Sequence, residues 1–131
     1  MNNFRNLKIW NRSIDLATDV YDATNRFPRT EQYGLTSQIR RSVVSISSNI
    51  AEGAGRKSEK EFSRFLNIAK GSCYELETQL LISKNLGFMA EEKFLKIEEE
   101  LVKIEKMIYA LVNRINQKKC NEVDRSMTIG H

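Results

Sequence analysis

The sequence predicts an all-α protein: an up-down-up-down four-helix bundle with a short flexible C-terminal tail. Apolar residues recur at three- and four-residue steps along four separate stretches, and turn or capping residues separate those stretches. One proline and six glycines in 131 residues leave few breaks inside them. Four amphipathic helices joined by short turns can bury their apolar stripes against one another. We expect a bundle over residues 1–117 and a tail over 118–131, where the periodicity is lost.

The first helix is expected over residues 4–27, with Asn6 as a candidate cap. It ends at Phe27-Pro28, because the residue before a proline is disfavoured in the helical conformation. Its predicted core face consists of Leu7, Trp10, Ile14, Ala17, Tyr21 and Thr24.

The second helix is expected from Leu35 or Thr36 to Glu52. Its β-branched residues are typical of strands, but the apolar positions lack strict alternation, so a helix is predicted. Gly53 and Gly55 follow, where a helix C-cap often takes a positive φ. The predicted core face consists of Leu35, Ile39, Val43, Ile46 and Ile50.

The third helix begins at a capping box, in which Ser58 is answered by Glu61, and it ends at Gly87. Its core face consists of Phe62, Phe65, Leu66, Ala69, Cys73, Leu76, Leu80 and Ser83. The fourth helix is expected from Glu91 to about Gln117. Its core face consists of Phe94, Ile97, Leu101, Ile104, Ile108, Leu111 and Ile115.

The composition says more about the cellular environment of the protein than about its activity. Two distant cysteines without a C-x-x-C motif favour a reducing, cytoplasmic compartment. No stretch approaches 18 uninterrupted apolar residues, so no membrane association is expected. The net charge of +4 and the pI near 9.1 are compatible with an anionic partner, although many proteins of this size carry as much charge without one.

Catalytic, metal-binding and cofactor-binding constellations are absent from the sequence. The only histidine is His131, so neither a Glu-x-x-His di-metal site nor a histidine-activated nucleophile has its parts within the predicted bundle. The segment Gly53–Ser58 is no phosphate loop, since Arg56 separates the second glycine from the lysine and a helix precedes it. Carboxylates such as Glu52, Glu61 and Glu75 more often form structural ion pairs than acid/base pairs. We therefore predict no enzyme, no cofactor and no metal.

Polar residues flank the core faces of the second and third helices. Serine and asparagine are poor helix formers, so their presence favours a packed polar contact, within one subunit or between copies. The alternative is a solvated face. The candidate packing or assembly residues are Gln38, Ser45, Asn49, Glu52, Glu61, Ser72 and Glu75.

Basic residues concentrate on the second helix and the turn after it, and the candidates for nucleic-acid binding are Arg40, Arg41, Arg56 and Lys57. A solvated basic face is the alternative, because no recognised reader motif is present and aromatic stacking partners near these positions are scarce in the sequence.

Two segments resemble a known family, the small four-helix-bundle proteins encoded in intervening sequences of bacterial 23S ribosomal RNA genes. They are F-P-R-T-E-Q-Y-G-L-T-S-Q-I-R-R-S-V-V-S-I-S-S-N-I-A-E-G-A-G-R (27–56) and S-x-x-E-F-x-x-F-L-x-I-A-x-G-S-x-x-E-L-E (58–77). With L-x-I-W (7–10) and L-G-F (86–88), the resemblance covers about residues 4–115. It departs at Ser47, where the family usually has proline, and this predicts a straighter second helix.

The resemblance implies a homopentamer with no known catalysis. Accessory variability proteins of retroelements, which bind a reverse transcriptase and nucleic acid through basic surfaces, are distantly similar. The function expected is a non-enzymatic, oligomeric scaffold associated with RNA or a ribonucleoprotein, with itself and RNA or DNA as partners. The alternative is a protein-interaction module that docks a partner enzyme such as a reverse transcriptase.

Overall fold

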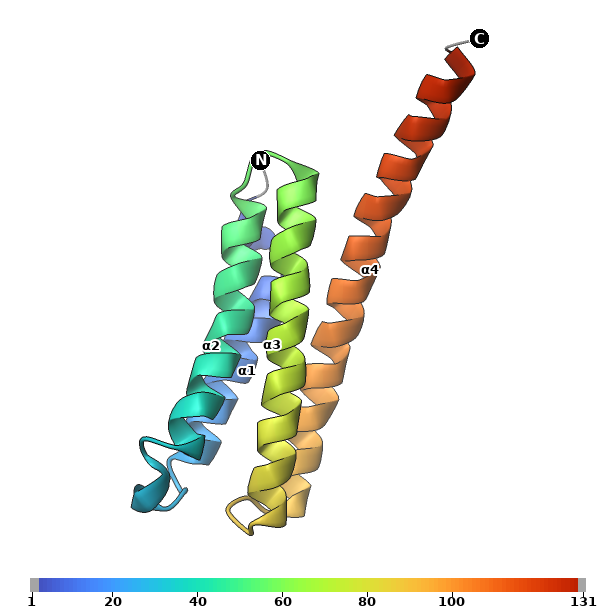
Figure 1. Cartoon of the computed structure of the whole chain (residues 1–131). Helices are drawn as coiled ribbons and strands as arrows, with labels where there is room; N and C mark the ends of the chain where they lie inside the picture. The colour runs from blue at the N-terminus through green and yellow to red at the C-terminus, as the bar shows by residue number, and fades with distance from the viewer. Residues whose placement is uncertain (1–2, 130–131) are drawn as a thin grey trace.

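The structure is a computed structural model that describes the backbone of residues 3–129 and the side chains of residues 3–118. It contains four α-helices, and the predicted all-α class is confirmed (Figure 1). The helices are α1 (Lys8–Thr24), α2 (Leu35–Ala54), α3 (Glu59–Asn85) and α4 (Glu91–Ile129). Two 3₁₀ turns, η1 (Phe4–Asn6) and η2 (Arg29–Glu31), precede α1 and α2.

The helices form a ring in which each packs against its neighbours in the chain and α4 returns to α1. Successive helices run in opposite directions, which gives the up-down-up-down arrangement (Figure 1). The most extensive contact joins α2 and α3. None of the described helices is both long and apolar enough to cross a membrane.

The predicted core faces of α2, α3 and α4 are confirmed, because nearly all their members are buried. The predicted face of α1 is confirmed only in part. Thr24 is buried, and Leu7, Trp10 and Ala17 are partly buried against the core, but Ile14 and Tyr21 are 38% and 41% exposed. The face that packs inward instead carries Ile9, Ser13, Leu16, Val20 and Thr24. The hydroxyls of Ser13 and Thr24 donate to backbone carbonyls of their own helix, at 2.7 Å and 2.9 Å, so these two polar residues are buried without losing a hydrogen bond.

The predicted serine cap of α3 is confirmed, since Ser58 Oγ accepts the N–H of Glu61 at 3.2 Å. The positive φ expected after α2 is wrong: Gly55 has a φ of −82°, and among the described residues only Gly87 has a positive φ, of 79°. Gly53 lies inside α2, where a Cβ atom would stand 2.6 Å from Cβ of Phe65. The glycine is therefore needed for the close approach of α2 to α3.

Four helix ends differ from the prediction, since α1 also ends at Thr24 instead of Phe27 and α2 at Ala54 instead of Glu52. Leu7, not Asn6, is the N-cap of α1, and Asn3 caps the preceding 3₁₀ turn through the N–H of Arg5. The backbone of α4 continues past Gln117 to Ile129 and extends beyond the ends of the other helices (Figure 1). Of the predicted tail, the side chains beyond Lys118 and the residues 130–131 lie outside the described part of the chain.

Candidate nucleic-acid interface

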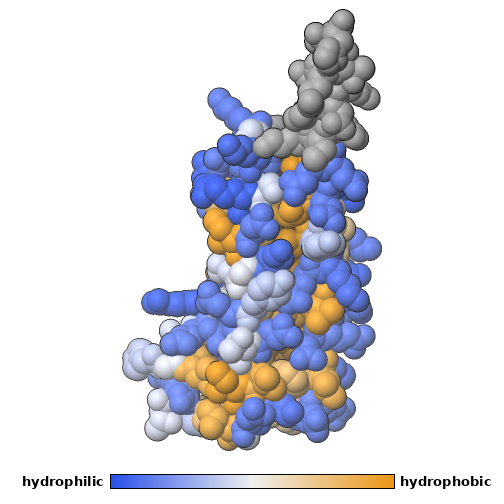
Figure 2. Space-filling view, turned by 45° about the vertical axis from the view of Figure 1, so that its right-hand side comes forward, coloured by the Kyte–Doolittle hydropathy of each residue, from blue (hydrophilic) through white to orange (hydrophobic). Residues whose placement is uncertain are grey.

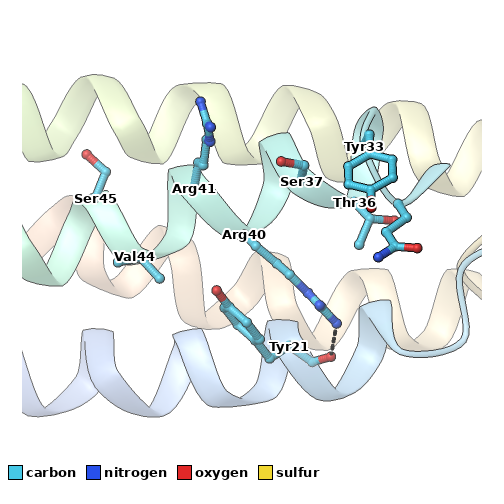
Figure 3. A pocket seen from close by; sticks show the side chains of 9 residues that line it. Tyr21, Tyr33, Thr36, Ser37, Arg40, Arg41, Val44 and Ser45 are labelled. Carbon is cyan, nitrogen blue, oxygen red and sulfur yellow. Dashed lines mark hydrogen bonds between the residues drawn. The ribbon is translucent and has the colours of Figure 1, made fainter.

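Arg40 and Arg41 are adjacent in sequence but occupy different environments. Arg40 is directed toward α1, where its Nε donates to Thr24 Oγ1 at 3.0 Å and its Nη2 donates to the Tyr21 carbonyl at 3.3 Å and Asn25 Oδ1 at 3.0 Å (Figure 3). Its guanidinium also lies 4.5 Å from the centre of the Tyr21 ring. A cation at the C-terminal end of a helix is favoured by the helix dipole. Arg40 therefore ties α2 to the last turn of α1.

Arg41 leaves α2 on the opposite side, toward α3 (Figure 3). It is exposed, and among the described side chains it has no hydrogen-bond or ion-pair partner. It lines two surface grooves, one on each side of α2. Arg41 is thus the arginine whose donors are free to meet a ligand.

The first groove, which we call the tyrosine–arginine groove, lies between α1, α2 and the turn before α2. Its volume is about 570 Å³, and its lining includes two arginines and two tyrosines and no carboxylate. The Arg40 and Tyr21 side chains lie on the α1 side, whereas Arg41 borders the groove and is directed toward α3 (Figure 3). Its lining residues are Tyr21, Gln32, Tyr33, Thr36, Ser37, Arg40, Arg41, Val44 and Ser45. The expected scarcity of aromatic partners is wrong at this place, because the fold brings Tyr21 from α1 and Tyr33 from the turn to the basic pair.

The second groove, which we call the serine groove, follows the seam between α2 and α3 and has a volume of about 290 Å³. The hydroxyls of Ser45 and Ser72 lie 2.9 Å apart, and Ser42 Oγ donates to Glu75 Oε2 at 3.5 Å. Asn49 Nδ2 donates to the Ser45 carbonyl at 2.8 Å. The polar flanks of the two helices thus meet within one chain, as the packed-contact hypothesis expects.

The remaining candidates for packing or assembly lie at the margins of this seam. Gln38 lines the serine groove beside Arg41. Glu52 pairs with Arg56 at 2.9 Å, and Glu61 pairs with Arg64 at 3.1 Å. All these contacts are local, so an assembly role for the glutamates stays a prediction.

The basic turn after α2 lies at the other end of the helix from Arg41, roughly 20 Å away at about 1.5 Å per residue. Arg56 is engaged there by Glu52 and lies 4.9 Å from the centre of the Phe65 ring. Lys57 is exposed, and no partner is found for it among the described side chains. The four residues predicted to contact nucleic acid therefore form two separate pairs, Arg40 with Arg41 and Arg56 with Lys57. In each pair the second residue has no partner among the described side chains.

Comparison with known families identifies the group to which this arrangement belongs. The model of the 23S rRNA-intervening sequence protein family matches residues 5–110. The chain is a member of that family.

This intervening-sequence protein is also similar to a crystal structure of a protein with unknown function from the S23 ribosomal protein family of Bacteroides thetaiotaomicron. The TM-score is 0.72, with 79% of this chain and 97% of that chain covered, and the sequence identity is 23%. At this identity the likeness shows a shared fold. No sequence match is found among curated proteins.

Glu52, Glu61 and Glu75 do not form one carboxylate cluster in the intervening-sequence protein. Glu61 and Glu75 lie about 21 Å apart along α3, at about 1.5 Å per residue. Glu77 and Glu105 meet instead on the opposite side, between α3 and α4. Burial raises the pKa of Glu105 to about 7, with further contributions from the charge and hydrogen bonding of Glu77 and the charge of Glu98. The sequence alone could not predict this pair, because the prediction requires knowing which residues of α3 lie opposite which residues of α4.

We expect this pair to make stability depend on pH. Because the folded-state pKa of Glu105 is raised, its protonation adds stability that is fully present below about pH 4.5 and is lost as the pH rises through about 7. Between pH 5 and pH 8, the wild-type protein should lose about 1 kcal/mol of unfolding free energy relative to Glu105→Gln, a figure that allows for the partial exposure of the group. Urea titrations of both proteins at the two pH values measure it, and parallel pH profiles would contradict it.

Proposed function

We propose that this intervening-sequence protein is a non-enzymatic, cytoplasmic scaffold that associates with RNA or a ribonucleoprotein through the tyrosine–arginine groove. The observation that carries the proposal is the charge of that groove, whose lining contains two arginines and no carboxylate. Such a surface attracts a phosphate backbone, and arginine suits it because the guanidinium can bind phosphate oxygens in a bidentate manner.

The two arginines contribute in different ways. Arg40 is held in one orientation by Thr24, Tyr21 and Asn25, so its charge is fixed at the groove wall before any ligand arrives. Arg41 is exposed on the ridge beside the groove, and its side chain, which is directed toward α3 in the structure, supplies the direct phosphate contact once it turns toward α1. A preorganised charge loses less conformational entropy on binding than a mobile one.

We further propose that the protein acts as an oligomer, as the pentameric assembly implied by the sequence resemblance suggests. Repetition of the groove around a ring would let one RNA contact several copies, and linked contacts raise the overall affinity beyond that of one site. Light scattering of the purified protein measures the mass directly. A monomer would remove this part of the proposal and leave the single-groove contact in place.

The expected result for the RNA contact is that labelled single-stranded RNA binds with strong salt dependence and that Arg41→Glu weakens binding about tenfold, with a flatter salt slope. Fluorescence anisotropy at several salt concentrations measures both. Arg114→Glu is the matched control. Arg114 is an exposed arginine of α4 that lines neither groove, and its substitution changes the net charge by the same amount. Absence of RNA binding at low salt by a protein of verified mass would contradict the proposal.

A partner protein is the second candidate, and one surface favours it. Exposed apolar side chains gather at the end of the bundle where α3 turns into α4, the lower end in Figure 2. They are Leu81, Ile82, Leu86 and Leu95. A partner enzyme that docks there would remain bound after nuclease treatment and would be released by Leu86→Asp, whereas an RNA-bridged partner would be lost with the nuclease.

A further inference from the structure

Tyr33 is the most exposed of the large hydrophobic side chains that the structure describes, at 91%. It lies in the turn between η2 and α2 and forms one side of the tyrosine–arginine groove (Figure 3). An aromatic ring in this position contributes little to the core. Its face is available to a planar partner, since aromatic side chains are the usual stacking platform for unpaired bases.

We infer that the tyrosine–arginine groove binds one unpaired nucleotide of single-stranded RNA, with its base stacked on Tyr33 and its phosphate held by Arg41. This rests on the proposed function and adds the form of RNA that the site takes.

The volume and the walls of the groove suit one nucleotide. Its volume of about 570 Å³ falls within the range of small-ligand sites, about 300–1,000 Å³. Opposite Tyr33 the wall is rigid, because the Arg40 guanidinium is stacked on Tyr21 and bonded to three acceptors. The half-exposed Val44 adds an apolar surface against which a base or ribose can pack.

Polar groups for the edge of a base are also present. Thr36 is only 7% exposed, yet its Oγ1 has no hydrogen-bond partner among the described residues. A buried hydroxyl without a partner costs free energy, and this one lines the groove beside Gln32 and Ser37. A base that enters the groove supplies the missing partner once the side chains that cover this oxygen turn aside.

The phosphate is assigned to Arg41 rather than to the N-terminus of α2. A Cβ atom built on Gly34, the N-cap residue of α2, would lie 3.1 Å from Glu31 Oε2. The positive end of the helix dipole therefore already faces a carboxylate, which repels a second anion. Arg41 has no such competitor among the described side chains.

The same geometry selects single strands over duplexes. A base inside a duplex is stacked on both faces and cannot reach an exposed ring, whereas an unpaired base can leave its strand and stack on the protein. Phosphates are available in both forms, so Arg41 contributes to both and Tyr33 contributes only to the single strand.

The test compares a fluorescein-labelled single-stranded ten-nucleotide RNA with a blunt duplex formed from the same strand and its complement, using the purified protein. Tyr33→Ala should weaken single-strand binding about tenfold and leave duplex binding unchanged. Tyr33→Phe keeps the ring and should remain within about twofold of wild type. Tyr109→Ala removes a ring that is 60% exposed on α4 and should change neither affinity.

The outcomes separate this inference from the proposed function. If Arg41→Glu weakens RNA binding while Tyr33→Ala does not, the groove holds phosphate without a base, and the inference fails while the function stands. If Tyr33→Ala weakens single-strand and duplex binding equally, stacking is also refuted. If the wild-type oligomer binds neither RNA, both proposals fall, and Tyr33 becomes a candidate for contact with a protein, since tyrosine and arginine are frequent in protein interfaces.

Discussion

The Gly53→Ala variant is expected to unfold with about 2 kcal/mol less free energy than the wild type. The added methyl group would stand 2.6 Å from Phe65 Cβ and 3.1 Å from Phe62 Cδ1. Phe65 Cβ is attached directly to the backbone of α3, so no side-chain rotation relieves the contact and the two helices must move apart. The loss outweighs the gain of about 0.5–1 kcal/mol that alanine normally brings inside a helix. Urea denaturation followed by circular dichroism measures the difference.

Gly71→Ala is the matched control on the other helix. A Cβ atom at Gly71 meets nothing within 4 Å, so only the helix-forming advantage of alanine remains. This variant should gain about 0.5–1 kcal/mol. The same substitution therefore has opposite signs at the two sites, and destabilisation at both or at neither would contradict the role assigned to Gly53.

The Arg40→Ala variant is expected to lose about 2 kcal/mol of unfolding free energy, because three hydrogen bonds from one guanidinium are removed at a partly buried contact. The figure allows for the water that can replace Arg40 at Asn25 and at the Tyr21 carbonyl, both exposed. Arg40→Lys keeps the charge but cannot reproduce the planar fork, so it should recover less than half of the loss.

Arg41→Ala is the control for this prediction. Since Arg41 is exposed and has no partner among the described side chains, its replacement should change stability by less than about 0.5 kcal/mol. RNA binding should be measured on both variants. Arg41→Ala, the more stable of the two, is expected to bind RNA more weakly than Arg40→Ala. Equal stability losses at Arg40 and Arg41 would show that the two arginines do not divide their roles.

Most of the fold was predictable because α2, α3 and α4 each carry one continuous apolar line that leaves no choice of core face. The first helix carries two, and sequence periodicity cannot rank them. The line through Trp10, Ile14 and Tyr21 is richer in large side chains, while the buried face includes Ser13, whose hydroxyl bonds to its own helix. A hydrophobicity pattern scores such a residue as polar and therefore does not predict that it is buried.

The candidate site was predictable only in part. The basic residues of α2 were found, and so were the serines that meet α3, because both stand out in composition. The sequence could not show which of the two arginines is hydrogen-bonded within the bundle and which is free, because this depends on where α1 lies. The aromatic component was missed for the same reason: Tyr21 and Tyr33 are 19 and 7 residues from Arg40 in sequence and approach it only after folding.

The position of Arg41 on the ridge between the tyrosine–arginine and serine grooves makes those grooves thermodynamically linked. One guanidinium cannot contact a ligand in the groove on one side of α2 and a ligand in the groove on the other side at the same time. A ligand that recruits it into one groove lowers the affinity of the other, and reciprocity requires that the second ligand weaken the first by the same factor. Two ligands that each required Arg41 could therefore not occupy both grooves of one subunit at once.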